Sequence, residues 1–466
     1  MINLGLLSFS DGRKRVHDGL AADILAHQNK IKTVLENTGE IAVYTGQDII
    51  SSSELARKEA MRLDSLHLDA VIFNLPVFSF PNFCAIASQM MRGPFLLLGP
   101  QDSRYPGLGG LLGAGGALSQ IGIPHERMWV DLDDSKVPER VLVFARAAAA
   151  VSRLRGQVFG LIGGRSIGMY TGAAPAEVWA RQFGVDIEHV DQSEIVRRSQ
   201  LIPKDTVTAA RNWIEKNVSE VRYDGRQLTP EKFEMQIRSW IAVQEIVDQF
   251  SFDFAGIKCH FDMSEFYCTQ CLAAAFINDP YDWRGAKQPV PLACEADSDG
   301  AMTMQIMRLI TGKPSCLLDL RFYDAEQDVL VMSNCGATAT WYTARSNDPV
   351  ENLSRVKIVP SITKYAGGGA HLEFVFGPGP LTLARLTRSK QGYRLLVARG
   401  KTVDCSGLKI KGAAANWPHA YVRSKTTIQD FVEKMEANHL HCVAGDCVAE
   451  LVLFSKMLNI ECVVTS

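Results

Sequence analysis

Two carboxylates, Glu295 and Asp319, each follow a short apolar run within residues 291–322. Carboxylates rarely stand at the end of a buried strand unless they are paired, hydrogen-bonded or bound to a metal. The two residues therefore predict a divalent-cation site in which the same acids also move protons. Ligation by oxygen atoms favours Mn²⁺ or Mg²⁺ over Zn²⁺. Asp297 and Asp299 belong to the same stretch and compete as ligands.

Each of the two acids also has a purely structural interpretation. Glu295 could cap the helix that follows "EADSDG", and Asp319 could pair with Arg321 or Arg308. The spacing of the residues leaves both interpretations open.

The segment "EANHLHCVAGD" contains His439 and His441, and we expect it to form a loop between two C-terminal helices. We expect only one of the two rings to face a given site, on the view that alternate positions of an extended segment point to opposite sides. A loop histidine beside Asn438 suits a metal ligand or a proton shuttle. A surface histidine is the alternative, and the role of His441 stays open.

Three further motifs and one arginine carry weaker signals. "CTQC" at Cys268–Cys271 has no second pair at zinc-ligand spacing, so we expect core cysteines. "GLGGLLGAGG" at 107–116 does not follow a strand directly, which disfavours nucleotide binding. The glycine-rich segment 160–172 does follow a strand, and it either binds an anion through main-chain amides or forms a tight turn. Arg13, after the first strand, is either an anion or polyol ligand or a solvated charge.

Strands and helices alternate over residues 1–155, which predicts an N-terminal α/β domain with a parallel sheet. Its expected strands are 1–10, 41–46, 68–78 and 93–100, and its expected helices are 16–39 and 51–66.

Residues 156–335 predict a central α/β domain that carries the metal-binding acids. Its expected strands are 156–164, 185–191, 252–259, 289–295 and 315–322, and its expected helices are 175–184 and 229–250. Ligands of open α/β sheets bind beyond the carboxyl ends of the strands. We therefore expect Glu295 and Asp319 at one edge of this sheet, on neighbouring strand ends.

Residues 336–466 alternate apolar and polar side chains and are punctuated by glycine and proline. This pattern predicts a β-rich, barrel-like C-terminal domain with terminal helices that supply His439. The expected fold class is α/β, with two Rossmann-like parallel-sheet domains followed by the β-rich domain.

The composition excludes several classes of protein. The 466 residues are 47% hydrophobic and 21% charged, with a formal net charge of −2, so neither nucleic acid nor a membrane surface is an expected partner. We find neither a signal peptide nor an apolar run long enough to span a membrane. Most of the eleven cysteines lie in apolar segments, which suits reduced thiols and a cytoplasmic location.

Six stretches spread along the chain resemble the L-fucose isomerase family and, more distantly, L-arabinose isomerases. They are "DGR" at 11–13, "GGRSIGMYT" at 163–171, "QSEIVRRS" at 192–199, "NDPYDWRG" at 278–285, the block 295–319, and "ANHLHCVAGDCVAELVLFSKMLNI" from Ala437. The resemblance implies a manganese-dependent aldose–ketose isomerase, with Mg²⁺ or Co²⁺ as substitutes. It also implies a homo-oligomer, trimer or hexamer, with sites at subunit interfaces.

The resemblance also implies the metal ligands. The family's "TEND" glutamate falls on Glu295, its "FADVR" aspartate on Asp319 and its "ANHG" histidine on His439. The chain departs from these motifs in "EADSDG" and in the "LH" after His439, and it looks shorter than the fucose enzymes. The sugar specificity and the role of Asp297 therefore stay open.

In such an enzyme the two carboxylates move a proton between C2 and C1 of a sugar through a cis-enediolate. Lys258, Trp417 and Asn438 are the expected sugar-binding residues, and Arg13 is expected to reach a neighbouring subunit's site. The substrate is a hexose, deoxyhexose or pentose, with an anionic (sulfonated or phosphorylated) sugar as a further possibility. A non-catalytic sugar-binding or sensing protein on the same scaffold is the alternative. The displaced glycine pattern disfavours a nicotinamide oxidoreductase.

Overall fold

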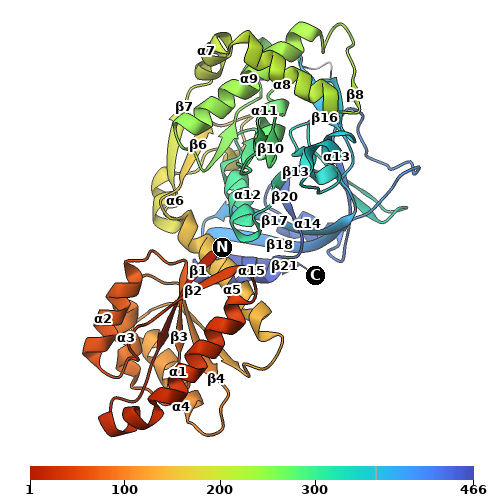
Figure 1. The fold of residues 1–466 in the computed structure, drawn as a ribbon. Helices are drawn as coiled ribbons and strands as arrows, with labels where there is room; N and C mark the ends of the chain where they lie inside the picture. Colours follow the sequence, from red (N-terminus) through yellow and green to blue (C-terminus); the bar gives the residue numbers. More distant parts are fainter. Residues whose placement is uncertain (363–364, 466) are drawn as a thin grey trace. The chain divides into compact units, whose positions relative to one another are not determined.

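The structure, a computed structural model, describes residues 1–362 and 365–465 (Figure 1). The chain forms two compact units. The first comprises Met1–Arg153 with Lys456–Asn459, and the second contains the remaining described residues.

The first unit is an α/β domain with a five-stranded parallel sheet in the order β2-β1-β3-β4-β5. Its strands are β1 Ile2–Ser8, β2 Ile41–Thr45, β3 Ala70–Asn74, β4 Phe95–Pro100 and β5 His125–Val130. Its helices are α1 Lys14–Glu36, α2 Ser53–Asp64, α3 Pro81–Met90, α4 Gly107–Gln120 and α5 Val137–Leu154. The strands and helices predicted from the sequence over this region are confirmed.

The glycine-rich segment 107–116 lies in helix α4 and is explained by close packing. A Cβ at Gly107 would lie 2.5 Å from the carbonyl oxygen of Pro76, in the loop after β3. The missing side chain therefore lets the helix approach the backbone of that loop.

The α/β part of the second unit has a four-stranded parallel sheet in the order β12-β9-β6-β7. Its strands are β6 Val158–Ile162, β7 Asp186–Val190, β9 Phe254–Ile257 and β12 Leu292–Cys294. Its helices are α6 Ala176–Gln182, α7 Ser193–Leu201, α8 Lys204–Asn217, α9 Pro230–Gln249, α10 Asp262–Phe266, α11 Cys271–Asn278 and α12 Ser298–Thr311, and the 3₁₀ turn η1 is Tyr170–Gly172.

The rest of the second unit is built on a closed six-stranded β-barrel, which confirms the barrel-like fold, although two of its strands lie before residue 336, where that domain was expected to begin. The ring runs β17-β20-β13-β14-β19-β18 and closes through the β17–β18 pair, and β21 pairs with β18 at residues 394–398, next to the part of β18 that pairs with β19. Its strands are β13 Ser315–Asp324, β14 Val329–Ser333, β17 Gly379–Ser389, β18 Gly392–Thr402, β19 His419–Ser424, β20 His439–Ala444 and β21 Glu461–Thr465. Helix α12 packs against the barrel at β17 and β20 (Figure 1).

Smaller elements complete this unit. They are β8 Glu220–Val221, β10 Tyr281–Asp282, β11 Gly285–Ala286, β15 Lys357–Pro360, β16 Ala370–Glu373, η2 Thr340–Thr343, α13 Pro349–Leu353, α14 Ile428–Lys434 and α15 Val448–Met457.

Two sequence-based predictions about these strands are wrong. The segment 315–322 was expected in the central parallel sheet, but it lies in β13, whose partners β14 and β20 are both antiparallel barrel strands. The segment around His439 was expected to be a loop between helices, but it forms β20, in which all six residues are buried. An apolar run of this length suits a buried strand enclosed by two neighbours, here β13 and β17.

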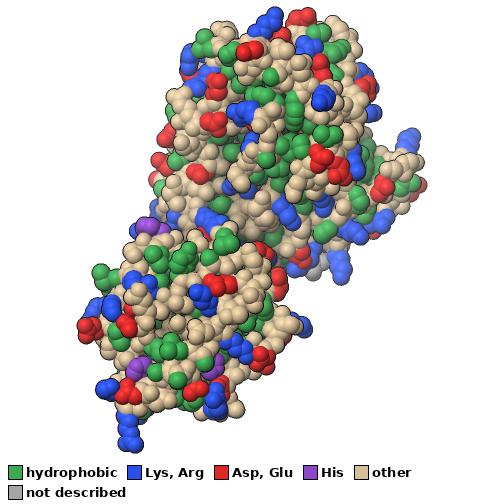
Figure 2. All heavy atoms as spheres, in the orientation of Figure 1, with side chains coloured by type: hydrophobic (Ala, Val, Ile, Leu, Met, Phe, Trp, Pro, Cys, Tyr) green, Lys and Arg blue, Asp and Glu red, His purple; other side chains and the backbone are tan. Residues whose placement is uncertain are grey.

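The surface and the thiols are unexceptional. All eleven cysteines are free, and Cys268 and Cys271 are buried as expected for core residues. Acidic and basic side chains are interspersed over the face shown in Figure 2.

No helix in the described part of the chain combines the length and the apolar character needed to cross a membrane.

Candidate active site

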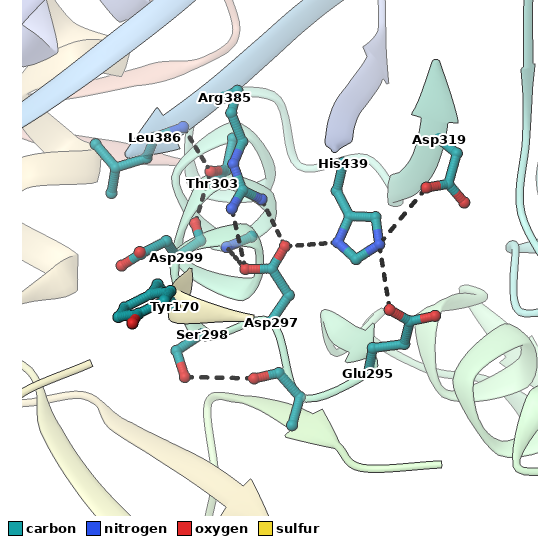
Figure 3. A network of polar contacts seen from close by, with 12 residues as sticks. Tyr170, Glu295, Asp297, Ser298, Asp299, Thr303, Asp319, Arg385, Leu386 and His439 are labelled. Carbon is teal, nitrogen blue, oxygen red and sulfur yellow. Dashed lines mark hydrogen bonds and ion pairs between the residues drawn. The ribbon is translucent and has the colours of Figure 1, made fainter. Parts of the chain in front are cut away.

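The second unit brings the three predicted metal ligands together (Figure 3). Asp319 of β13 and His439 of β20 are register partners in the barrel, and Glu295 follows β12 of the parallel sheet. His439 Nε2 lies 3.5 Å from Glu295 Oε2 and 3.7 Å from Asp319 Oδ1. Two carboxylates from different sheets therefore flank one imidazole nitrogen.

A left-handed turn aims Glu295 at the barrel. Glu295 and Ala296 have φ values of 59° and 52°, which non-glycine residues rarely adopt. The turn is held because the Ala296 amide donates to the carbonyl of Ile257 in β9. Backbone strain of this kind, held in place by neighbouring structure, is frequent where a side chain is positioned for function.

The two acids do not share a sheet edge, so the prediction of neighbouring strand ends is wrong. Glu295 does lie at the carboxyl edge of the parallel sheet, whereas Asp319 is in the middle of β13. The capping alternative is also wrong, because the residue whose side chain caps α12 is Asp297, which accepts from the Gly300 amide at 3.0 Å. The guanidinium of Arg321 donates to the carbonyl of Gly412.

The environment shifts the pKa values of two of these groups. The Asp319 side chain is 41% exposed, yet burial raises its pKa to about 6; nearby His439 opposes this shift. Burial lowers the pKa of His439, but the carboxylates of Asp297 and Glu295 outweigh it and raise that pKa to about 10. The imidazole is therefore surrounded by negative charge.

Asp297 connects His439 to a buried arginine. His439 Nδ1 lies 2.7 Å from Asp297 Oδ2, and Arg385 of β17 donates to the two Asp297 oxygens at 2.6 and 3.1 Å. The side chains of Asp297 and Arg385 are both fully buried. Burial raises the pKa of Asp297, but Arg385 and His439 outweigh it and hold that pKa well below its usual range.

His441 lies near the same network as His439, so the premise that the two rings point to opposite sides is wrong, whereas His439 is the ring that contacts Glu295 and Asp319. Successive residues of a strand alternate between its faces, so positions two apart share a face. His441 is fully buried in β20, and burial together with the charge of Arg385 lowers its pKa well below its usual range. It is therefore a neutral ring beside the Asp297–Arg385 pair.

His260 is a site residue that the sequence analysis missed. Its Nε2 lies 3.7 Å from Glu295 Oε1, on the side of that carboxylate away from His439. Ser166 of the glycine-rich segment donates to the His260 carbonyl at 3.0 Å, so this turn fastens the loop after β9. The signal for His260 was its place just beyond the carboxyl end of a predicted buried strand.

The predicted sugar-binding residues have mixed surroundings. Lys258 directly follows β9 and pairs with Asp262 at 2.5 Å. Asn438 is exposed, and its side-chain hydrogen bond lowers the pKa of the neighbouring Asp319. Trp417 is half-buried beneath the guanidinium of Arg321, which lies 5.0 Å from its ring centre.

Arg13 belongs to the first unit, where its exposed guanidinium forms two hydrogen bonds to Asp11, at 2.9 and 2.7 Å. Its predicted reach into a neighbouring subunit stays a prediction.

Glu295, Asp319 and His439 have the right chemistry for a divalent cation. Among the described residues no three His, Cys, Asp or Glu side chains are drawn together closely enough to enclose an ion. Yet the 3.5 and 3.7 Å separations around His439 Nε2 are within about 1 Å of the roughly 3 Å between adjacent ligands of a small ion. The other ring nitrogen faces a carboxylate, as it does in most metal-ligating histidines.

Comparison with known proteins agrees with this architecture. Residues 1–156 match the first N-terminal domain of L-fucose isomerase, 247–312 its second N-terminal domain, and 332–465 its C-terminal domain. L-fucose isomerases from Escherichia coli O9:H4 (strain HS) and Shigella dysenteriae serotype 1 (strain Sd197) are 23% identical over 446 residues, covering 79% of this chain and 76% of theirs. With three consecutive domains matched, the chain belongs to the L-fucose isomerase family.

Proposed function

We propose that the chain is a metal-dependent aldose–ketose isomerase that interconverts an aldose and its ketose through a cis-enediolate. The observation that carries the proposal is the convergence of Glu295 and Asp319 on His439 Nε2, at 3.5 and 3.7 Å. The family membership supports the reaction class.

The residues divide the chemistry between them. One carboxylate removes the proton from C2 of the sugar and the other delivers a proton to C1, and the O2 hydroxyl proton passes to O1 through the same two groups. Asp319, at the exposed edge of the site, is accessible to the sugar from solvent, whereas Glu295 lies deeper, between His260 and His439. His260 is placed to orient the Glu295 carboxylate during the transfer.

Glu295, Asp319 and His439 would hold the metal, with Mn²⁺ as the first candidate and Mg²⁺ or Co²⁺ as substitutes. A divalent cation there supplies Lewis-acid stabilisation of the negative charge that develops on the sugar oxygens. With three protein ligands, further coordination positions remain for those oxygens.

The substrate is proposed as a hexose, deoxyhexose or pentose, and L-fucose is the first candidate because it names the relatives. Lys258, which follows β9 and pairs with Asp262, is the proposed cationic side chain for the polar end of the sugar, including an anionic one. We also propose a homo-oligomer, trimer or hexamer, in which Arg13 of one subunit approaches the site of the next.

The test is a sugar panel with defined metal content. Protein stripped with EDTA is assayed alone and with Mn²⁺, Mg²⁺ or Co²⁺ on L-fucose, pentoses, neutral hexoses, and sulfonated and phosphorylated hexoses, with ketose formation as the readout. We expect ketose from at least one sugar, loss of activity on stripping and recovery with Mn²⁺. In D₂O, we expect deuterium at C2 of the recovered aldose, because the proton passes through an acid that exchanges with solvent.

Full activity in the stripped protein would contradict the metal dependence. Ketose formation without any deuterium exchange would contradict the enediolate step. Sugar affinity with no ketose in any condition would favour the binding-protein alternative.

A further inference from the structure

We propose that Asp297 is a positioning residue, which orients the His439 ring so that its Nε2 faces Glu295 and Asp319. This inference rests on the proposed role of His439 as a metal ligand. Its geometric basis is the 2.7 Å contact between Asp297 Oδ2 and His439 Nδ1 (Figure 3). A bound cation would displace the Nε2 proton, and the hydrogen that stays on Nδ1, directed at a carboxylate, then leaves the Nε2 lone pair for the site.

The Asp297 carboxylate itself accepts three further hydrogen bonds, from two partners. Arg385 of β17 donates to both of its oxygens, at 2.6 and 3.1 Å, and the Gly300 amide of α12 donates to Oδ1 at 3.0 Å. Such paired, charge-assisted bonds fix both the position and the rotation of a carboxylate. Asp297 therefore cannot turn away from His439 without breaking several buried contacts.

The contacts also join parts of the second unit that the site needs together. Asp297 begins α12 after the parallel sheet, Arg385 belongs to β17 and His439 to β20. Glu295 precedes Asp297 by one intervening residue, so the network that orients His439 also ties the Glu295 turn to the barrel. The network therefore fixes the position of Glu295, which follows the parallel sheet, relative to Asp319 and His439 of the barrel.

Figure 3 also draws a second buried acid near this network, and it serves as a matched control. Asp299 lies two residues further along α12, and Arg388 of β17 donates to its Oδ2 at 2.8 Å. Arg388 also donates to the carbonyls of Ala173 and Tyr170, at 2.9 and 2.6 Å. None of the polar contacts found among the described residues joins Asp299 to His439, so this pair fastens α12 without orienting the ring.

The experiment compares full-length wild type with D297N, D299N and the double variant D297N/R385Q. Asparagine keeps the size and the helix-capping ability of aspartate, but its amide group can present either a donor or an acceptor to His439. The double variant removes both buried charges together and so leaves no unpaired guanidinium in case D297N alone fails to fold. Free Mn²⁺ is measured by electron paramagnetic resonance during titration, and thermal unfolding of the metal-free proteins is recorded in parallel.

We expect Mn²⁺ affinity to fall about 10- to 100-fold in D297N and in D297N/R385Q, and to stay within about threefold of wild type in D299N. We expect this loss of Mn²⁺ affinity in D297N/R385Q even when the unfolding temperature of that variant is close to that of D299N. If Asp297 had only a structural role, replacing either buried acid, Asp297 or Asp299, would lower Mn²⁺ affinity in proportion to the stability that the variant loses.

Two outcomes overturn the proposal and separate it from the proposed function. Wild type that binds no Mn²⁺ contradicts the metal assignment and the positioning role together. Wild type that binds Mn²⁺ while the folded D297N or D297N/R385Q protein binds equally well contradicts the positioning role alone.

Discussion

Asp319 and His439 face each other as register partners across the antiparallel strands β13 and β20. Directly opposite residues of an antiparallel pair keep their Cβ atoms about 5 Å apart, so the barrel itself fixes their separation. The barrel is closed, and β20 is enclosed between β13 and β17. Two of the three proposed ligands therefore sit on a rigid frame, and the Glu295 turn brings the third to it.

Replacing Asp319 by asparagine is expected to lower kcat by at least about 100-fold, the scale for a lost acid or base. The fold should be retained, because this side chain is partly exposed. Steady-state kinetics at saturating Mn²⁺ and thermal unfolding measure the two effects.

Asp324 on the same strand is the control for Asp319. It is 1% exposed and accepts hydrogen bonds from the amides of Lys411 and Glu326. Asp324→Asn should lower stability and leave kcat within about threefold of wild type. Near-wild-type turnover in Asp319→Asn would be irreconcilable with the proposed proton transfer.

Metal binding should stabilise the native protein. At 100 times the dissociation constant, a ligand that binds only the native state adds about 2.7 kcal/mol to the free energy of unfolding. Mn²⁺ should therefore raise the unfolding temperature of the wild type, and Glu295→Gln should lose most of that increase. Glu326→Gln is the control, because Glu326 is an exposed acid paired with Lys411. An equal rise in Glu295→Gln would place the bound metal elsewhere.

The residue types of the site were readable from the sequence, but their arrangement was not. Glu295 stands out because it directly follows an apolar run, and His439 because it lies beside Asn438 in a segment that resembles the family's histidine motif. The sheet that contains Asp319 could not be inferred, since an apolar run of four to eight residues suits a parallel sheet and a barrel equally well. The pairing of β13 with β20 joins segments that are far apart in the sequence, so the local sequence does not predict it.

The contacts that support the site were even harder to predict from the sequence. Arg385 in "LTLARLTRS" is of a residue type that is seldom fully buried, yet its side chain is fully buried. Its partner Asp297 is 88 positions away in the chain. His260 was overlooked because a histidine just after a strand is compatible with many surroundings, and only the fold places it beside Glu295.

Asp299 should make stability depend on pH. Burial raises its pKa from 3.8 to about 7, although Arg388 opposes this shift. Between about pH 4 and 7 the folded state therefore binds a proton that the unfolded state does not. The contribution of Asp299 to the free energy of unfolding therefore falls by up to about 1.4 kcal/mol per pH unit as the pH rises through this range, and it is constant above pH 7.

Urea unfolding of wild type and Asp299→Asn at pH 5 and at pH 7.5 isolates this group, because the other titrating residues are common to both proteins. The stability of wild type relative to the variant should be greater at pH 5 than at pH 7.5. A difference that is the same at the two pH values would mean that Asp299 is ionised throughout this range.

Gly300 is required where α12 meets the barrel. A Cβ there would lie 2.6 Å from His441 Nε2 and 2.8 Å from Asp297 Cγ. Gly300→Ala should therefore destabilise the second unit by about 1–3 kcal/mol, the cost of overpacking. It should also weaken Mn²⁺ binding, because relief of the clash moves Asp297.

Gly19, in the second turn of α1, is the matched control for Gly300, since a Cβ at that position meets nothing within 4 Å. Gly19→Ala should stabilise the first unit by about 0.5–1 kcal/mol, because alanine has the higher helix propensity, and should not change Mn²⁺ affinity. Urea unfolding, read in the transition of the unit that holds each residue, and Mn²⁺ titration measure both changes. A Gly300→Ala protein with wild-type stability and affinity would show that His441 and Asp297 move aside freely, which is incompatible with a rigid Asp297 holding His439 in place.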